Sequence, residues 1–565
     1  MTRRDAGSNL LAAMLNRRRF LSGTAGAGVG LAGVRTLGAA PGPRSAGSRT
    51  RGQQGGTFTF AMWQSPDSLD PAVSGLISAG YVLGQVYESL IWHLPGLQPD
   101  KEFYPGLAES WEISPDAKEY TFHLRKDVKF HDGTPLTAEA IKVTYDHIVD
   151  PNTKSRSAVT ALGPYDHTEI IDDYTAKIVF KEPNGAFLNT VAQPTFSPSS
   201  PAALQKYGVD YGQNPVGTGP FMFKEWVVND HVTLVRNPDY AWPSPAFKNQ
   251  GPPLIDEIVF RIIPDAATRV NALKTGEVDM AENLPPQDVV GFQGDAGFQV
   301  FNASVTGMPY CIMVNAAKAP TDNLKVRQAL QFATSQEQIV EALYQGVYEP
   351  SHNVFLPTTL GYDESLDAMY SYDPAKAAAL LDEAGWVLDG DVRKKDGQEL
   401  KLNFVNIANF GFDDISLLLQ AQFQEIGIQA EISAESFPTV GETYNRGDHN
   451  LADFFYYAVD PYFMRALFNC DQIAAGFNWM HYCNPDLDAL VQQGNSTGDA
   501  EQRAQIYAQA AKVAMEAAVV IPIYEQRAVF AGKTSIKDLL FSVIGEQPVC
   551  REHHRLSLGR CKHDE

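Results

Sequence analysis

The length of the chain limits what it can fold into. A single hydrophobic core stops growing at roughly 250–300 residues, and this chain has 565 residues. Strand-like and helix-like patterns alternate along it, with strands prominent in the first half and helices in the second. The sequence therefore predicts an α/β fold that is divided into at least two lobes.

Several segments carry clear signals of secondary structure. Apolar residues alternate with polar ones from Tyr120 to Arg125, which predicts a strand with one buried face. Asp265 and Asp373 are the predicted N-caps of helices that end at Gly276 and Gly385. Further predicted elements are strands at 56–63, 400–407, 428–432 and 519–524, and helices at 137–149, 415–426, 485–494 and 499–518.

The charge balance excludes some classes of partner. The formal net charge is -22, and residues 1–51 hold nine Arg and one acidic residue, so the rest of the chain is more acidic still. An acidic protein is repelled by nucleic acid phosphates and by anionic membrane surfaces. We expect no nucleic acid partner, and diffuse surface charge that keeps the protein in solution.

The N-terminus has the pattern of an export signal. The run from Asn16 to Ser22 contains Arg17, Arg18, Phe20 and Leu21, and it resembles the twin-arginine export motif. A small, apolar, glycine-rich stretch follows from residue 23 to residue 40, too short and too glycine-rich to span a bilayer. We therefore predict a signal peptide over residues 1–40, a Pro/Gly/Ser-rich linker over 41–56, and a mature protein outside the cytoplasm.

The five cysteines do not form a metal-binding or thioredoxin-type motif. No C-x-x-C arrangement is present. Cys470 with Cys483, and Cys550 with Cys561, could each close a short loop in an oxidising compartment. Cys311 lies in an apolar run and is expected to be buried. We predict no metal site and no cofactor, and we expect residues 551–565 to form a tail.

A set of short runs in the mature chain resembles the family 5 extracellular solute-binding proteins, the peptide, dipeptide and nickel-binding group. They occur in the order found in that family and span most of residues 57–530. The runs are Tyr104–Trp111, Tyr120–Glu139, Asn214–Phe221, Arg236–Tyr240, Pro264–Asp265, Ala272–Asp279, Val326–Leu330, Tyr372–Trp386 and Ile426–Ile428.

The resemblance implies a two-lobed fold of the periplasmic-binding-protein type (type II), with two hinge crossings near Asn302–Val314 and Val519–Tyr524. Lobe I would comprise residues 57–305 and 522–550, with an inserted subdomain at 96–213, and lobe II would comprise residues 306–521. Such a protein binds its ligand by hinge closure. It works as a monomer, without a cofactor, and its partners are the permease and ATPase of an ABC importer.

The resemblance also points to a ligand position in lobe II. Peptide-binding relatives place an Asp, which pairs with the ligand's ammonium group, four residues before the Pro of an Asp-Pro step. Here that step is Asp460-Pro461, and the anchor position holds Tyr457. The stretch Lys401–Gln420, where dipeptide binders carry an Arg, contains none. A dipeptide held at both charged ends is therefore disfavoured, since an unpaired buried charge is costly. A longer peptide held through its backbone and an oligosaccharide both remain open.

Aromatic side chains are the best candidates for ligand contacts, because they offer a large contact area and lose few rotamers. Core packing is the alternative interpretation for each of them. The resemblance also implies that Cys470 and Cys483 form a disulfide. The candidate ligand-binding residues are Tyr456, Tyr457, Asp460, Trp63, Trp226 and Trp479.

Two other classes of function compete with this interpretation. Gly494–Gly498 fits the G-x-S-x-G pattern of an exported hydrolase, with Ser496 as nucleophile. A nucleophile elbow needs a strand before the serine, whereas a helix is predicted to end at Gly494, so we expect no enzymatic activity. A sensing or chaperone-like protein with the same two lobes is left open by the sequence.

Overall fold

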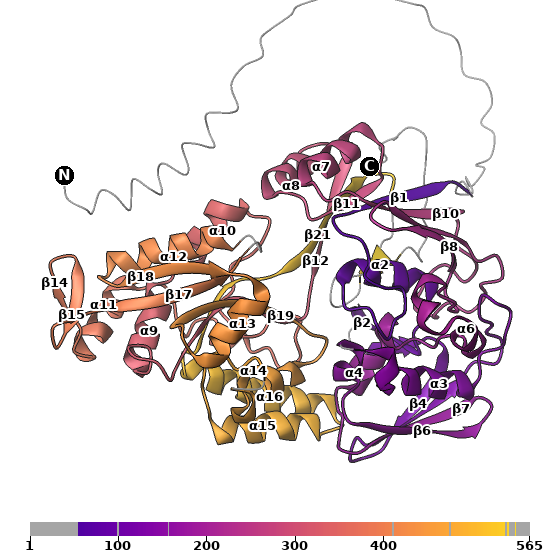
Figure 1. Ribbon diagram of the computed structural model, residues 1–565, viewed down its shortest axis with the longest axis horizontal. Coiled ribbons are helices and arrows are strands. Elements are labelled where there is room, and N and C mark those ends of the chain that lie inside the picture. Colours follow the sequence, from indigo (N-terminus) through magenta and orange to yellow (C-terminus); the bar gives the residue numbers. More distant parts are fainter. Residues whose placement is uncertain are drawn as a thin grey trace, which may run out of the picture. The chain divides into compact units, whose positions relative to one another are not determined.

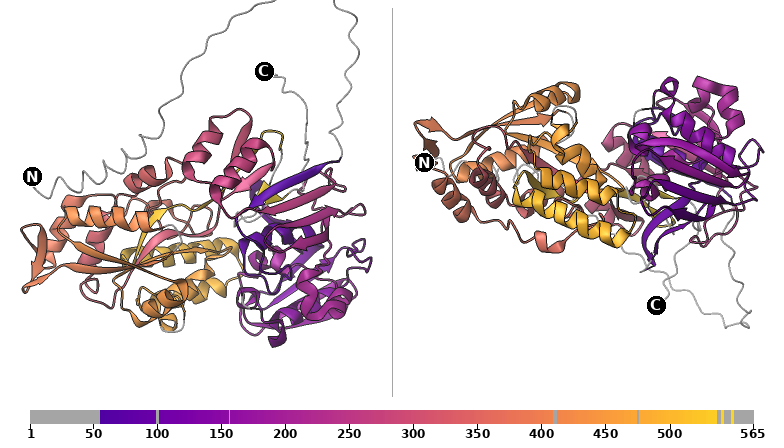
Figure 2. Two further views of the ribbon diagram at one scale, coloured as in Figure 1. Left: turned by 45° about the horizontal axis from the view of Figure 1, so that its top comes forward. Right: turned by 90° about the horizontal axis from the view of Figure 1, so that it is seen from below.

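Two β-sheets organise the part of the chain that the structure describes. The computed structural model describes residues 55–98, 101–155, 157–408, 412–473, 476–536, 540–541 and 548–549. The predicted signal peptide and the predicted tail lie outside these residues. We call the portion that carries a seven-stranded sheet lobe I and the portion that carries a five-stranded sheet lobe II. Figure 2 shows by colour that lobe I combines early and late segments of the chain.

The sheet of lobe I mixes parallel and antiparallel pairs. Strand β1 pairs in parallel with β10 and β11, whereas β9, β8, β21 and β12 join antiparallel to their neighbours. The apolar residues Phe58 and Phe60 of β1 alternate with threonines, which gives the strand its buried face. The order in the sheet is β12 (Phe298–Ser304), β21 (Arg527–Lys533), β11 (Met280–Glu282), β1 (Thr57–Met62), β10 (Glu257–Ile262), β9 (His231–Arg236) and β8 (Phe221–Val227).

An inserted portion between β1 and β8 has a core of its own. Its four-stranded sheet buries Tyr120, Phe122 and Leu124 on one face of β5, which confirms the predicted alternation. The sheet order is β4 (Ala108–Ile113), β5 (Glu119–Leu124), β7 (Thr175–Phe180) and β6 (Tyr165–Asp172), and a hairpin of β2 (Ile91–Gln98) and β3 (Lys101–Pro105) precedes it.

The helices of lobe I begin and end largely where capping residues predict. Asp265 accepts a hydrogen bond from the backbone of Thr268, and Gly276 follows the helix with φ of +80°. Thr137 occupies an N-cap position, but its hydroxyl makes no capping hydrogen bond. These helices are α2 (Ile77–Val86), α3 (Ala138–Val149), α4 (Ser157–Leu162), α5 (Phe187–Val191), α6 (Pro201–Tyr207), α7 (Ala266–Thr275) and α8 (Pro286–Gln293).

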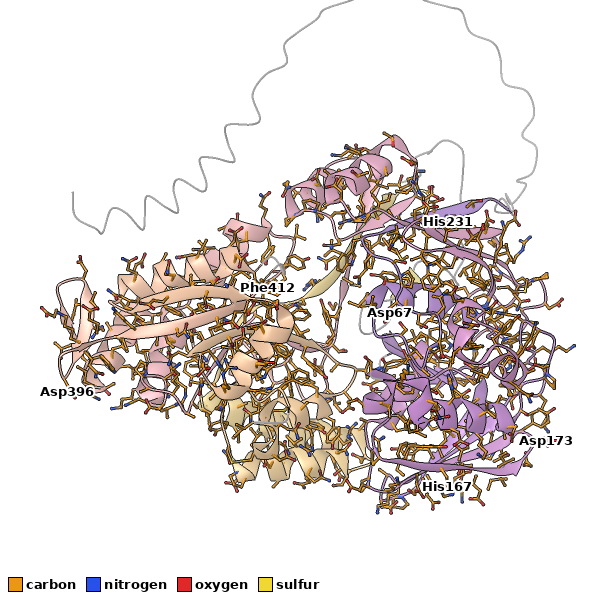
Figure 3. The ribbon with its side chains drawn as sticks, in the orientation of Figure 1. Asp67, His167, Asp173, His231, Asp396 and Phe412 are labelled. Atoms are coloured by element: carbon orange, nitrogen blue, oxygen red, sulfur yellow. A yellow bond between two sulfur atoms is a disulfide. The ribbon has the colours of Figure 1, made fainter. Side chains whose placement is uncertain are left out.

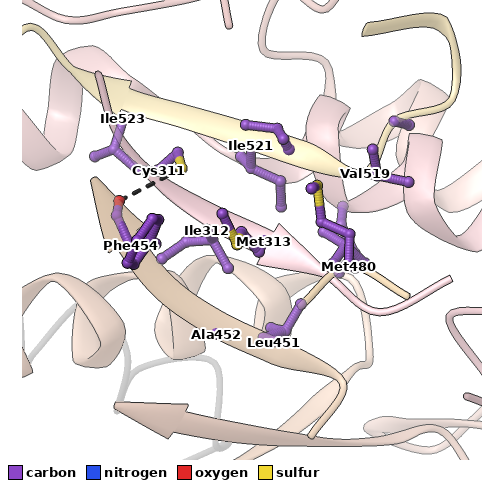
Figure 4. Packing of buried hydrophobic residues seen from close by; sticks show 14 of the residues in the cluster. Cys311, Ile312, Met313, Leu451, Ala452, Phe454, Met480, Val519, Ile521 and Ile523 are labelled. Carbon is purple, nitrogen blue, oxygen red and sulfur yellow. Dashed lines mark hydrogen bonds between the residues drawn. The ribbon is translucent and has the colours of Figure 1, made fainter. Parts of the chain in front are cut away.

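In the sheet of lobe II, β13 lies between β19 and β20, and this strand is buried along its whole length. Its continuous apolar sequence is typical of a strand that is covered on both faces. Cys311 lies within it as a buried free thiol, as predicted, and donates to the carbonyl oxygen of Phe454 (Figure 4). The sheet order is β18 (Gln429–Glu435), β17 (Lys401–Ile407), β19 (Leu451–Tyr457), β13 (Gly307–Val314) and β20 (Val520–Tyr524).

Helices surround this second sheet. The predicted capping of α11 is confirmed, because Asp373 accepts from the backbone of Lys376 at 2.9 Å and Gly385 follows with φ of +85°. Helix α12 begins at Asp413, two residues before the predicted start, since acidic residues are favourable in a first turn. The helices are α9 (Leu324–Ala333), α10 (Gln336–Tyr344), α11 (Pro374–Glu383), α12 (Asp413–Glu425), α13 (Phe437–Arg446), α14 (Met464–Phe468), α15 (Pro485–Asn495) and α16 (Ala500–Glu516), and β14 (Val387–Asp389), β15 (Val392–Lys395) and β16 (Gln398–Glu399) form a small separate sheet.

The chain passes between the two sheets at two points. Strand β12 ends at Ser304 in lobe I and β13 begins at Gly307 in lobe II. Figure 1 shows β12 beside β21 where the chain passes between the lobes. Strand β20 ends at Tyr524 in lobe II and β21 begins at Arg527 in lobe I. The second boundary thus falls at 525–526 rather than at 522, because β20 pairs with β13 and belongs to the sheet of lobe II.

Candidate functional site

The carboxyl ends of the parallel strands point to the candidate site. In open α/β sheets, ligands bind outside these ends. Ser304, the last residue of β12, pairs with Arg527, and Gly307, the first residue of β13, pairs with Tyr457, the last residue of β19. Strand β12 runs in the direction of β1, and β19 runs in the direction of β17. Both crossings therefore lie at the carboxyl edges of both sheets.

Trp63 occupies this edge in lobe I. It directly follows β1, and its side chain is 41% exposed. Its backbone N–H donates to Oε1 of Glu282 at 3.1 Å, and the hydroxyl of Tyr81 donates to Oε2 at 2.6 Å. Burial raises the pKa of Glu282 to about 7, against the lowering effect of these hydrogen bonds. A buried carboxyl group thus fixes the backbone of an exposed tryptophan at the sheet edge.

The other two candidate tryptophans lie elsewhere. Trp226 is in β8, at the opposite end of the seven-stranded sheet from β12, and it packs against the core of lobe I. Trp479 is only 2% exposed, and its Nε1 donates to Oδ1 of Asn445 at 2.9 Å. Its ring packs edge-on against Phe454, with 4.9 Å between the ring centroids. We therefore assign both tryptophans to packing rather than to the candidate site.

The two candidate tyrosines of β19 point to opposite faces of the sheet, as neighbouring strand residues do. Tyr456 stacks on Phe463 with 5.9 Å between the ring centroids and packs against the core of lobe II. Tyr457 packs against Phe455 at 5.4 Å, and Phe455 packs against Phe412 at 5.9 Å. Tyr457, the last residue of the strand, is the one at the carboxyl edge.

An aromatic group at this edge of lobe II was not predicted as a site from the sequence. Phe412 (labelled in Figure 3) precedes α12, and its ring centroid lies 4.4 Å from that of Tyr310. Tyr310 stacks on Tyr524 at 5.2 Å, with the rings 21° apart. Tyr524 ends β20, so the signal that would have found it is the position of an aromatic residue at the end of a predicted strand.

Asp460 is engaged within the protein. Its carboxylate is 5% exposed and accepts two hydrogen bonds from Nη2 of Arg503, at 2.8 and 2.9 Å. The backbone N–H of Tyr462 donates to the same carboxylate at 2.9 Å, and so does Nδ2 of Asn189 at 2.8 Å. With its charge matched by Arg503, Asp460 serves as half of a buried ion pair, which removes it as a free anchor for a ligand's ammonium group.

The segment after Asp460 is braced by covalent and polar bonds. Cys470 and Cys483 form a disulfide, the pair that the family resemblance implied. Within the loop that it closes, Nδ2 of Asn478 donates to the carbonyl oxygens of Phe468, Asn469 and Tyr482. This bracing holds α14 and the chain that leads to α15 in one arrangement.

Ser496 does not have the surroundings of a nucleophile. It follows α15, and its hydroxyl donates to the carbonyl oxygens of Gln492 and Gln493. The serine therefore completes the end of a helix, where a nucleophile elbow would need a preceding strand.

Among the described residues there is no group of three or more His, Cys, Asp or Glu that could hold a metal ion. In the same part of the chain, no helix has the length and apolar character needed to cross a bilayer.

Known proteins with the same sequence pattern and fold exist. The family model "Bacterial extracellular solute-binding proteins, family 5 Middle" matches residues 102–474. A di/tripeptide-binding protein of Pseudomonas aeruginosa is 30% identical over 469 residues, which cover 78% of this chain and 84% of that protein. A glutathione-binding protein of Salmonella choleraesuis is 29% identical over 477 residues, which cover 82% and 88% of the two chains.

Solved structures share the two-lobed fold. NikA from Brucella suis, in complex with Fe(III)-EDTA, matches with a TM-score of 0.77 and 23% identity, over 88% of this chain and 99% of that one. DppA from Helicobacter pylori, in complex with the peptide STSA, matches with a TM-score of 0.70 and 24% identity, over 88% and 97% of the two chains. With a family model that covers most of the chain, this protein belongs to the bacterial extracellular solute-binding proteins of family 5.

Proposed function

We propose that this protein captures a short peptide or peptide-like solute between its two lobes and delivers it unchanged to the permease and ATPase of an ABC importer. The observation that carries the proposal is the pair of crossings at the carboxyl edges of both sheets, in a chain that matches family 5 over residues 102–474. A solute held there contacts both lobes at once. Only contacts that are better in the closed form can shift the lobes toward closure.

The chemistry of the lobe II edge narrows the proposed ligand. At this edge the ring of Tyr457 is half-buried and the rings of Phe412 and Tyr524 are buried, whereas Asp460 is already paired with Arg503. The described residues that follow β17, β18 and β19 there, namely Ala408, Phe412–Asp414, Ser436 and Ala458–Asp460, include no Lys or Arg. A ligand carboxylate would find no cation among them. We therefore propose a ligand of more than two residues that is held through its backbone and through aromatic contacts.

The site of action follows from the N-terminal pattern. We propose that the twin-arginine-type motif with Arg17 and Arg18 exports the chain, and that the protein acts as a monomer in the periplasm or at the outer face of the cell membrane. A strain that lacks the twin-arginine translocase should retain the protein in its cytoplasm. Secretion at the normal level in such a strain would contradict this route.

The binding proposal is tested with a defined panel of solutes. The purified protein is titrated by calorimetry with di-, tri- and tetrapeptides, glutathione and short oligosaccharides, and its radius of gyration is measured by X-ray scattering with each of them. We expect binding of tri- or tetrapeptides with a decrease in the radius. Mass spectrometry after denaturation should then recover the peptide at its original mass.

Other outcomes decide against the proposal. Binding of oligosaccharides without any peptide would identify a different ligand class. Recovery of a cleaved peptide would identify a hydrolase, and a Ser496→Ala variant would then show whether that serine is responsible.

A further inference from the structure

The two lobes touch at a place that is separate from the crossings. Three hydrogen bonds join residues 183–189 of lobe I to lobe II. The backbone N–H of Gly185 donates to the carbonyl oxygen of Asn495 at 2.8 Å, and Nδ2 of Asn495 donates to the carbonyl oxygen of Pro183 at 2.9 Å. Nδ2 of Asn189 donates to Asp460. We call this set of contacts the interlobe contact.

The charges in the lobe II half of the interlobe contact are balanced within lobe II. Arg503 balances the charge of Asp460, and its Nε donates to the carbonyl oxygen of Gly494 at 2.9 Å. If lobe I moved away, Asp460 would lose the hydrogen bond from Asn189 but would keep its counter-charge. Separation of the lobes therefore leaves no buried charge without its counter-charge. An ion pair that loses one partner destabilises a protein strongly only when the other charge stays buried and unpaired.

The bonding across the interlobe contact is polar and incomplete. Oδ1 of Asn189 and Oδ1 of Asn495 are buried without a hydrogen-bond partner. Each such acceptor costs free energy while the contact is made, and water satisfies it when the contact opens. Water can likewise replace each of the three hydrogen bonds. The contact therefore has the energetics of a surface that forms and separates, unlike an apolar core.

Gly185 shows how closely the lobes approach. A Cβ atom at this position would lie 2.8 Å from the carbonyl oxygen of Asn495 and 2.9 Å from that of Thr497, both in lobe II. The φ angle of Gly185 is not in the left-handed region, so the backbone of lobe I itself accepts alanine there. The three heavy atoms nearest to such a Cβ atom, which include Nε of Arg503 at 3.1 Å, all belong to lobe II, so a side chain at position 185 would obstruct the approach of lobe II.

We propose that the interlobe contact is a latch, made and broken as the lobes move on the two crossings, which favours the closed arrangement even before a solute is bound. Its use in holding a solute rests on the proposed function, but its opening and closing do not. The G-x-S-x-G run at Gly494–Gly498 then serves to shape the lobe II side of the latch, because Asn495 and Thr497 provide the carbonyl groups that meet Gly185.

The test uses the solute-free protein with one fluorescent label on each lobe. Cysteines replace Val209 in lobe I and Val387 in lobe II, which are 98% and 61% exposed, in a chain with Cys550→Ser and Cys561→Ser. Single-molecule energy transfer should resolve a short-distance and a long-distance population. Gly185→Ala should lower the ratio of short to long about fivefold to thirtyfold, as expected for the loss of one to two hydrogen bonds, and Asn189→Ala about fivefold.

Gly498→Ala is the matched control. This glycine lies in the same loop as Thr497, but a Cβ atom there would have no heavy atom within 4 Å. The ratio of the short-distance to the long-distance population in Gly498→Ala should therefore equal that of the parent chain. The melting temperature of Gly185→Ala should stay within about 2 °C of the parent value. A single distance population in the parent, an unchanged ratio in Gly185→Ala, or a large loss of its thermal stability would each overturn the latch. Since no solute is present, such a result leaves the proposed ligand untouched.

Discussion

Two buried carboxyl groups illustrate how the surroundings of a single residue set its role. Asp460 has the guanidinium group of Arg503 at 2.8 Å and is part of an ion pair. Glu282 is equally buried, but its hydrogen bonds come from the neutral hydroxyl of Tyr81 and the backbone of Trp63. Burial therefore dominates at Glu282 and raises its pKa to about 7. The two residues should respond differently to mutation and to pH.

Replacing Arg503 by Leu should destabilise the protein strongly. The substitution leaves the carboxylate of Asp460 buried and uncompensated, which typically costs about 3–5 kcal/mol. The free energy of unfolding, measured in urea, should fall by this amount. Arg446→Leu is the control, since the Arg446–Asp448 pair is more than half exposed and should cost at most about 1 kcal/mol. Equal losses of unfolding free energy in the two variants would show that the buried ion pair matters no more for stability than the exposed one.

Glu282 should make stability depend on pH between about 4.5 and 7. In this range the unfolded state has lost the proton of Glu282, with its ordinary pKa of 4.5, while the folded state keeps it. Stability contributed by the neutral group is therefore fully present below pH 4.5 and is lost as pH rises to about 7, by roughly 3 kcal/mol. In urea unfolding measured across the range, Glu282→Gln should reduce this slope by the contribution of Glu282, while Asp453, whose pKa burial also raises to about 7, keeps its own contribution. Glu277→Gln, at an exposed position, should keep it; an unchanged slope in Glu282→Gln would contradict the assignment.

At the scale of secondary-structure elements, the sequence predicted best those helices and strands whose two ends are marked by capping or terminating residues of their own. Helix α11 has its N-cap, its proline and its terminal glycine within a short stretch, and it forms as predicted. The segment from α14 to α15 has weaker local signals for secondary structure. The disulfide between Cys470 and Cys483 restricts the conformations of this segment instead. A cross-link acts mainly by restricting the unfolded chain.

Reduction of the disulfide should therefore lower the stability of the protein measurably. For two cysteines 13 residues apart, loop closure predicts a loss of about 3 kcal/mol. The free energy of unfolding of the parent chain, measured in urea, should fall by this amount when a reductant is added. The variant with Cys470→Ser and Cys483→Ser should already show the loss and should not respond to the reductant. A response of equal size in the variant would assign the effect to other cysteines.

At the scale of the whole molecule, the fold depends on the two crossings at which the chain passes from one sheet to the other. The first crossing ends at Gly307, which has φ of +119° and lies opposite Tyr457 at the start of β13. A Cβ atom at this position would be 2.3 Å from the carbonyl oxygen of Tyr456. Both the backbone angle and the close approach require glycine, and both concern the junction that joins the lobes.

Gly307→Ala should therefore disrupt the molecule more than most alanine substitutions. We expect a loss of more than about 2 kcal/mol, or failure to obtain folded protein, because a strained angle and a clash with backbone coincide. Thermal unfolding and soluble yield measure this outcome. Gly291→Ala serves as the control, since a Cβ atom there meets no heavy atom within 4 Å and its φ is not positive. Normal stability of Gly307→Ala would mean that the crossing tolerates a different path.

The sequence by itself determined the fold class, the caps of several helices, the family and the burial of Cys311, because these depend on local patterns and on motifs in order. It also brought Trp63 and Tyr457 forward as candidates. Only the tertiary structure decided that Trp479 lies in the core and that Asp460 is bound to Arg503, 43 residues further along the chain. The same holds for the approach of Gly185 to Asn495. Contacts between distant segments depend on how sheets and helices assemble, and no local pattern in either segment specifies its partner.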